Sequence, residues 1–219
     1  MTDTERKEES PRKRAKVTKT TTSFTGTREG SCSQAHLVYD GASESNHSRF
    51  HKKFIQFCEA PCTPCTEGTK LVMKMKVINF ENDWPACDES KIDLSHTGYT
   101  SLEVTDCIYT VVLPAKLECL TYKAPYVNFE IPPTFESLTW MKITLEESVT
   151  ISDFVKWIQA CPKLKFLEVL HLGDRLEFGL CEVKQYLLAH TALKEVWIHC
   201  AEQKNYTSEE IPMPFWDKR

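Results

Sequence analysis

The chain has 219 residues, 41% of them hydrophobic, which is enough for one domain with a buried core. Its formal net charge is −4, and residues 1–20 carry seven Lys/Arg against four Asp/Glu, so +3 falls on this segment and −7 on the rest. This balance argues against a nucleic-acid-binding surface on the folded part, and no apolar run reaches the roughly 18 residues that span a bilayer.

The N-terminal segment, residues 1–44, is rich in Thr, Ser, Lys, Arg and Glu, and we expect it to be a disordered tail because it has little to bury. A basic cluster in it is typical either of a nuclear-import signal or of a solvated tail; the cluster consists of Arg12, Lys13, Arg14 and Lys16. Because no apolar signal segment is found, the ten cysteines are expected to be reduced thiols, in the nucleus or cytoplasm.

The folded part is expected over 45–219. An apolar stripe with a spacing of three to four residues predicts a helix over about 47–58, and its members are Phe50, Phe54, Ile55 and Cys58. Apolar residues then alternate with lysines over 71–78, which predicts a half-buried strand.

From Tyr99 onward, five segments fit a template of apolar, two residues, apolar, one residue, apolar. They are Tyr99/Leu102/Val104, Leu117/Leu120/Tyr122, Phe135/Leu138/Trp140, Leu164/Leu167/Val169 and Leu193/Val196/Ile198. The starts lie 18, 18, 29 and 29 residues apart. Prolines in the short gaps favour extended returns, whereas amphipathic patterns at 152–160 and 182–190 favour helices in the long ones.

These observations predict an α/β fold: a short, irregular leucine-rich-repeat solenoid with parallel strands and helical or extended returns. Such a stack needs its open end covered, and we expect residues 201–219 to form a C-terminal cap.

The repeat region resembles the degenerate leucine-rich repeats of plant F-box proteins of the FBD type, over about residues 45–200. The resemblance is carried by L-P at Leu113, F-E-S-L-T-W-M from Phe135 and C-P-K-L-K-F-L-E-V-L from Cys161. It implies the substrate-binding part of a ubiquitin-ligase adaptor. The F-box itself is not visible between Ala15 and Ser45, so contact with the ligase linker subunit is expected only if an F-box is supplied elsewhere.

In a solenoid of this kind, the residues between the inward apolar positions form an exposed concave face that binds a protein partner. The residues expected there are Glu103, Thr121, Thr139, Glu168 and Trp197. An exposed Trp197 is a suitable binding anchor, although packing beneath the C-terminal segment would also account for it. We expect a monomer that binds neither nucleic acid nor a membrane.

The cysteines Cys58, Cys62 and Cys65 form the sharpest local cluster, and they leave a metal-binding protein, with zinc or an iron–sulfur cluster, as the alternative function. A fourth ligand is not evident, so we expect an ordinary cysteine-containing loop without a metal. No nucleophile elbow, phosphate-binding glycine loop or H-E-x-x-H sequence is present. We therefore expect a non-catalytic recognition module without a cofactor.

Overall fold

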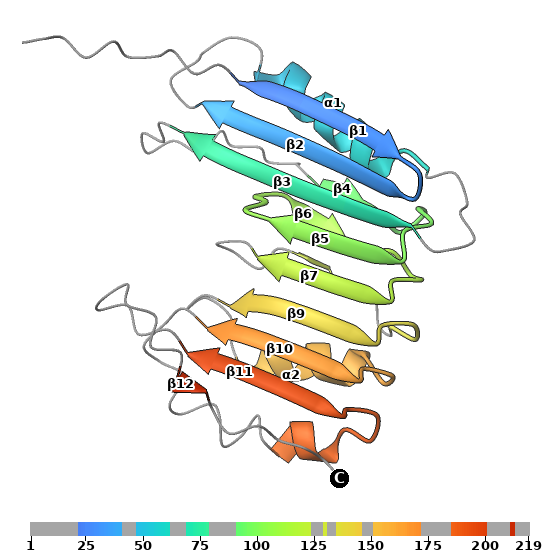
Figure 1. Ribbon diagram of the computed structural model, residues 1–219, viewed down its shortest axis with the longest axis vertical. Coiled ribbons are helices and arrows are strands. Elements are labelled where there is room, and N and C mark those ends of the chain that lie inside the picture. Colours follow the sequence, from blue (N-terminus) through green and yellow to red (C-terminus); the bar gives the residue numbers. More distant parts are fainter. Residues whose placement is uncertain are drawn as a thin grey trace, which may run out of the picture.

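The computed structural model describes residues 22–40, 47–61, 69–78, 91–123, 129–130, 135–145, 151–171, 185–200 and 211–212. The chain is α/β, with a mostly parallel main sheet and few helices (Figure 1). In spatial order, this sheet consists of β1 (Ser23–Glu29), β2 (Cys32–Asp40), β3 (Lys70–Ile78), β5 (Ser101–Thr105), β7 (Cys119–Lys123), β9 (Trp140–Leu145), β10 (Phe166–His171), β11 (Glu195–Cys200) and β12 (Ile211–Pro212). All neighbours from β2 to β11 are parallel, and only the two ends are antiparallel.

The two faces of the main sheet differ in what covers them. Behind it in Figure 1 lie α1 (His47–Glu59), α2 (Ile151–Ala160) and a small parallel sheet of β4 (Lys91–Asp93), β6 (Thr110–Val112) and β8 (Phe129–Glu130). No helix or strand of the described part of the chain covers the opposite face, which we call the open face (Figure 1). Among the described residues, the core therefore lies on one side of the sheet.

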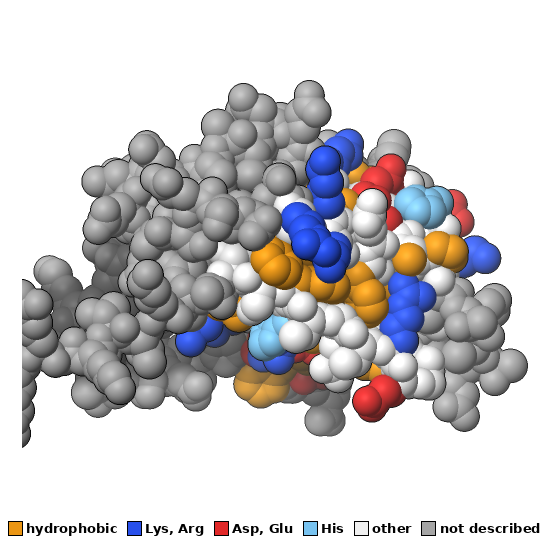
Figure 2. Space-filling view, turned by 90° about the horizontal axis from the view of Figure 1, so that it is seen from above, with side chains coloured by type: hydrophobic (Ala, Val, Ile, Leu, Met, Phe, Trp, Pro, Cys, Tyr) orange, Lys and Arg blue, Asp and Glu red, His pale blue; other side chains and the backbone are white. Residues whose placement is uncertain are grey.

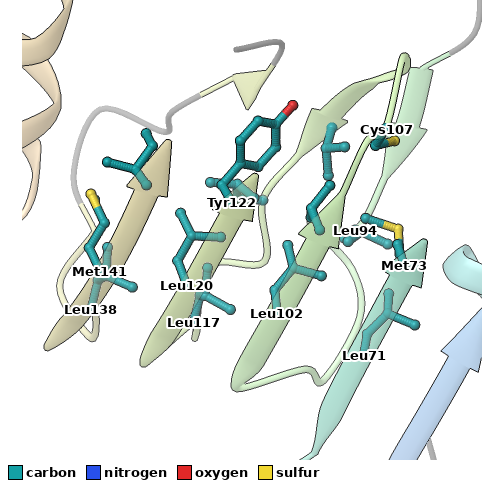
Figure 3. Packing of buried hydrophobic residues seen from close by; sticks show 14 of the residues in the cluster. Leu71, Met73, Leu94, Leu102, Cys107, Leu117, Leu120, Tyr122, Leu138 and Met141 are labelled. Carbon is teal, nitrogen blue, oxygen red and sulfur yellow. The ribbon is translucent and has the colours of Figure 1, made fainter. Parts of the chain in front are cut away.

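The core is built from apolar residues that lie in register on neighbouring strands. Leu71, Leu102, Leu120, Met141 and Leu167 form one row, and Met73, Val104, Tyr122, Ile143 and Val169 form the next. All of these side chains are buried, and Figure 3 shows members of the first row projecting to the same side of the sheet. Burial of each such side chain contributes about 1.5–3 kcal/mol, so the apolar rows exclude a one-residue slip, which would turn every side chain to the other face.

A second regularity lies in the backbone at the start of each strand. One carbonyl accepts hydrogen bonds from two successive N–H groups of the next strand segment, at N···O distances of 2.7–3.1 Å. The accepting residues are Thr69, Thr100, Glu118, Thr139 and Lys165. Because the same bridge recurs at five successive steps, the strands begin at equivalent levels although the returns between them differ.

The third apolar triplet predicted from the sequence is wrong in register. Leu120 lies beside Met141, so the triplet equivalent to the others is Leu138/Met141/Ile143. Phe135 is buried, but it precedes the strand, and its N–H donates to the Ala160 carbonyl at the end of α2. Two overlapping sets of apolar residues, offset by three positions, therefore satisfied the same template.

The prediction of a disordered tail over residues 1–44 is wrong for residues 22–40, because β1 and β2 form an antiparallel hairpin there. Ala35, Leu37 and Tyr39 alternate toward the core and are buried. The turn begins at Gly30, which has φ of 55°, the conformation that a two-residue hairpin turn requires at this position. Thr-rich sequence suits an edge hairpin that buries one face. The basic cluster at Arg12–Lys16 lies outside the described residues.

Helix α1 closes the covered face behind β1 and β2. It buries Phe54 and Cys58, and its C-terminal end is held by Arg28 of β1. The Arg28 guanidinium donates to the carbonyls of Phe57, Ala60 and Pro61 at 3.1–3.3 Å. A cation at this end of a helix also interacts favourably with the helix dipole.

The C-terminal part of the fold contains α2, a short helical stretch at residues 185–189 and the last strands. α2 buries Phe154, Val155 and Ile158 against the core. Of the expected cap over 201–219, the described part is Ile211–Pro212, which pairs with β11. None of the described helices has the length and hydropathy needed to cross a membrane.

Candidate binding surface on the open sheet face

Four of the five predicted surface residues lie in one row across the open face. In register order from β2 to β11, this row consists of Gln34, Val72, Glu103, Thr121, Lys142, Glu168 and Trp197. Thr139 is the exception, because it precedes β9 and its Oγ1 donates to the Glu118 carbonyl. Lys142 occupies the position in the row that the sequence assigned to Thr139, because the third triplet is shifted by three residues.

An aromatic pair that the sequence did not predict lies beside this row. Trp140 and Phe166 are register neighbours on β9 and β10, and their rings stack with centroids 5.2 Å apart and planes inclined by 4°. Both side chains are half-buried. The apolar template assigned Trp140 to the core. Alignment of Trp140 with Cys119 on β7 would have assigned it to the open face.

Two ion pairs link neighbouring strands on the same face. Lys142 Nζ lies 2.6 Å from Glu168 Oε1, directly beside the aromatic pair. Lys70 Nζ lies 2.9 Å from Glu103 Oε2, nearer the N-terminal end of the sheet. These side chains are partly exposed, so each pair contributes at most about 1 kcal/mol to folding. Two of the predicted binding residues therefore already have a cation beside them.

Trp197 lies in the same row as Glu168, at the C-terminal side of the aromatic pair. Its indole Nε1 donates to Glu195 Oε1 at 2.7 Å, from the same strand two residues earlier. The side chain is half-buried, and this hydrogen bond limits the orientations of the ring. The alternative, packing beneath the segment Pro212–Trp216, is not tested, because residues 213–216 lie outside the described residues.

A basic region of the open face lies over β3 and β7. Lys74 and Lys76 project from β3 and Lys123 from β7, and all three are exposed. Lys74 and Lys123 belong to one row, through Thr105 on the strand between them. Within the described ranges, none of these three lysines forms an ion pair. The open face thus combines an aromatic patch over β9 and β10 with a basic region over β3 and β7.

The covered face holds the described cysteines that are fully buried. Burial raises the pKa of the Cys58 thiol well above its ordinary value, and the nearby Cys107 and Glu59 raise it further. Burial also raises the pKa of Cys107 and of Cys161 to about 12. These thiols are therefore neutral at physiological pH, as expected of apolar fillers.

The alternative of a metal site depended on Cys58, Cys62 and Cys65. Cys62 and Cys65 lie outside the described residues, so the structure does not test whether they lie near Cys58. Among the residues that the structure does describe, no group of three His, Cys, Asp or Glu side chains is arranged to hold a metal ion. The metal site therefore stays an untested alternative.

The fold and its surface define an α/β protein whose main sheet packs one face on the core, while no described helix or strand covers the other. A scan against protein-family models finds no matching family, and searches of curated proteins and of solved structures find no significant match.

Proposed function

We propose that this chain is a short leucine-rich-repeat solenoid that recognises a protein partner on its open face, without catalysis. The observation that carries the proposal is the stacked pair of Trp140 and Phe166, which lies on a sheet face without a helical or strand cover in the described structure. Aromatic side chains in such positions are the commonest anchors of protein interfaces.

The repeated architecture supports the solenoid part of the proposal. With the third triplet corrected to Leu138, the repeats start at residues 99, 117, 138, 164 and 193, which are 18, 21, 26 and 29 residues apart. Each start precedes an equivalent backbone bridge to the previous strand. Units of this size that stack by neighbour contacts alone are the defining feature of solenoids.

The chemistry of the open face indicates what kind of partner fits it. The aromatic pair offers an apolar surface, while the Lys142–Glu168 ion pair beside it offers a donor and an acceptor at the edge. The exposed lysines on β3 and β7 attract carboxylates. A partner segment with apolar side chains followed by acidic ones therefore complements the face along its length.

The resemblance to F-box leucine-rich repeats supports a more specific proposal, that the chain serves as the substrate-binding part of a ubiquitin-ligase adaptor. In that case, affinity capture of the tagged chain recovers a cullin-associated linker subunit together with a substrate. Capture that recovers partners but never a linker subunit would remove the ligase role and leave the recognition function.

The recognition surface itself is tested by Trp140→Ala/Phe166→Ala. Partners captured by the wild-type chain are identified, and the affinity of a purified one is measured by calorimetry. We expect the double variant to lose at least about 30-fold in affinity, because removing a central aromatic anchor costs about 2 kcal/mol or more.

The matched control is Lys52→Ala/Lys53→Ala, two exposed residues of α1 on the opposite side of the main sheet. It should bind with unchanged affinity, and circular dichroism should show the native fold for both double variants. Equal affinity of the aromatic variant and the wild type would place the partner elsewhere and contradict the proposal.

A further inference from the structure

β1 forms the first strand of the main sheet, and its outer edge has no strand partner among the described residues. β2 pairs with its other edge along all seven residues. An unpaired edge of this length pairs readily with another strand unless proline, lysine or a bulge obstructs it. The β1 sequence, S-F-T-G-T-R-E, contains neither proline nor lysine, its pairing with β2 has no bulge, and its two charged residues, Arg28 and Glu29, are both at its C-terminal end.

The hairpin decides which backbone groups of β1 point outward. Glu29 lies opposite Cys32 across a two-residue turn, and the residues that flank such a turn exchange both of their ladder hydrogen bonds. Because this pattern alternates along an antiparallel ladder, the N–H and C=O groups of Phe24, Gly26 and Arg28 face away from β2.

These three residues are symmetric about Gly26. If a second copy of β1 pairs antiparallel with the first and is centred there, Gly26 lies opposite Gly26 and Phe24 lies opposite Arg28. Every outward-facing group then meets a partner in a hydrogen-bonded position. A guanidinium against an aromatic ring is also favourable, and Arg28 already lies over the Phe57 ring, 4.9 Å from its centroid.

The other face of the joined strands is equally compatible with self-pairing. Thr25 of one copy lies opposite Thr27 of the other, at the closely spaced, non-hydrogen-bonded positions, and both threonines are exposed in the single chain. Ser23 lies opposite Glu29. No two like charges face each other along this ladder, so the strand is complementary to itself in charge as well as in hydrogen bonding.

The surface beside β1 has apolar area for a second copy to cover. Phe24 and Phe57 contact each other edge to face with centroids 5.8 Å apart and are only partly buried. Phe57 lies so close to Gly26 that a Cβ there would be 2.8 Å from its ring. Figure 2, which looks onto this end of the molecule, shows an apolar band with lysines and arginines beside it.

We propose that two copies of this chain associate through β1, antiparallel about Gly26, so that their main sheets join into one continuous sheet. This goes beyond the recognition function and stands in place of the monomer expected from the sequence. The aromatic pair on β9 and β10 stays available in each copy, because four strands separate β1 from β9 in the sheet.

The experiment is a charge test at Thr25 and Thr27 in the full chain under reducing conditions. The molar mass is measured by sedimentation equilibrium over a range of concentrations. We expect the wild type to form dimers. Thr25→Lys/Thr27→Lys places like charges opposite each other across the two-fold axis and should reduce dimerisation by at least about tenfold, since like charges directly opposite are destabilising.

The matched variant Thr25→Lys/Thr27→Glu carries the same number of substitutions but places a lysine opposite a glutamate, so it should dimerise like the wild type. Both positions are exposed, and unchanged thermal unfolding of the monomer confirms that the fold is intact. A wild type that stays monomeric up to its solubility limit, or dimers equally stable in both variants, would overturn the proposal.

Discussion

Two buried cysteines make the stability of this protein sensitive to alkaline pH. Cys107 and Cys161 lie on the covered face with no exposed surface, and burial raises the pKa of each to about 12 from an ordinary value of 9.0. A group whose pKa is raised on folding stabilises the protein below the unfolded pKa. That contribution is lost as the pH rises from the unfolded value to the folded one, because only the unfolded chain then loses its protons.

We therefore expect the free energy of unfolding to fall above pH 9 by about 1.4 kcal/mol per pH unit for each of these thiols. The measurement is urea denaturation at several pH values under reducing conditions. Cys107→Ala/Cys161→Ala should show a shallower decline than the wild type, whereas Thr121→Ala, which removes no titratable group, should leave the slope unchanged. Parallel slopes in all three proteins would contradict the assignment.

At the scale of the element, the strands show which features of the fold can be predicted from apolar periodicity. The inward rows at Leu102 and Leu120 follow from the sequence because alternating side chains on a half-buried strand have a period of two. Register between strands does not follow, because it is set by backbone bridges such as that from Thr139 N–H to the Glu118 carbonyl. Local pattern contains no information about these bridges.

The same reason explains which parts of the open face were predictable. Glu103, Thr121, Glu168 and Trp197 lie between correctly placed inward residues, so the sequence placed them in one row. The aromatic pair was missed because the apolar template accepts a tryptophan on the open face as readily as an apolar residue in the core. The cross-strand ion pairs were missed because they depend on register between segments about 26 or more residues apart.

The inward row predicts a sharp contrast between adjacent residues of β7. Leu120 is fully buried between Leu102 and Met141, so Leu120→Ala should reduce the free energy of unfolding by about 2–5 kcal/mol. Thr121→Ala, one residue later on the open face, should change it by less than about 0.5 kcal/mol. Chemical denaturation measures both. Similar losses in the two variants would show that β7 does not have this orientation.

At the scale of the whole molecule, the folded part extends further toward the N-terminus than composition indicates. β2 pairs with β3 over its full length, and Ala35 and Leu37 join the same core as Leu71. Charge and a high content of Thr and Ser suggested a tail because those properties describe the exposed side of the hairpin. Only every second residue of the hairpin is buried, and an average over the composition of the whole segment does not reveal this alternation.

Removal of this hairpin should therefore damage the whole stack. A chain that begins at residue 45 lacks β1 and β2, exposes the apolar faces of β3 and α1, and should unfold at a clearly lower temperature or aggregate. A chain that begins at residue 22 should keep the cooperative unfolding of the full-length protein. Differential scanning calorimetry of the three chains distinguishes these outcomes. Equal stability of the chain from residue 45 would show that the hairpin is not part of the cooperative unit.

The recurring carbonyl bridges have an evolutionary consequence. Since each strand is aligned by main-chain atoms at its first residues, the segment that returns to the next strand is under little constraint in length or conformation. Here one return contains β6 and another contains α2, yet the strands that they connect begin at matching levels. Insertions and deletions in the returns can therefore accumulate without moving a single residue of the open face.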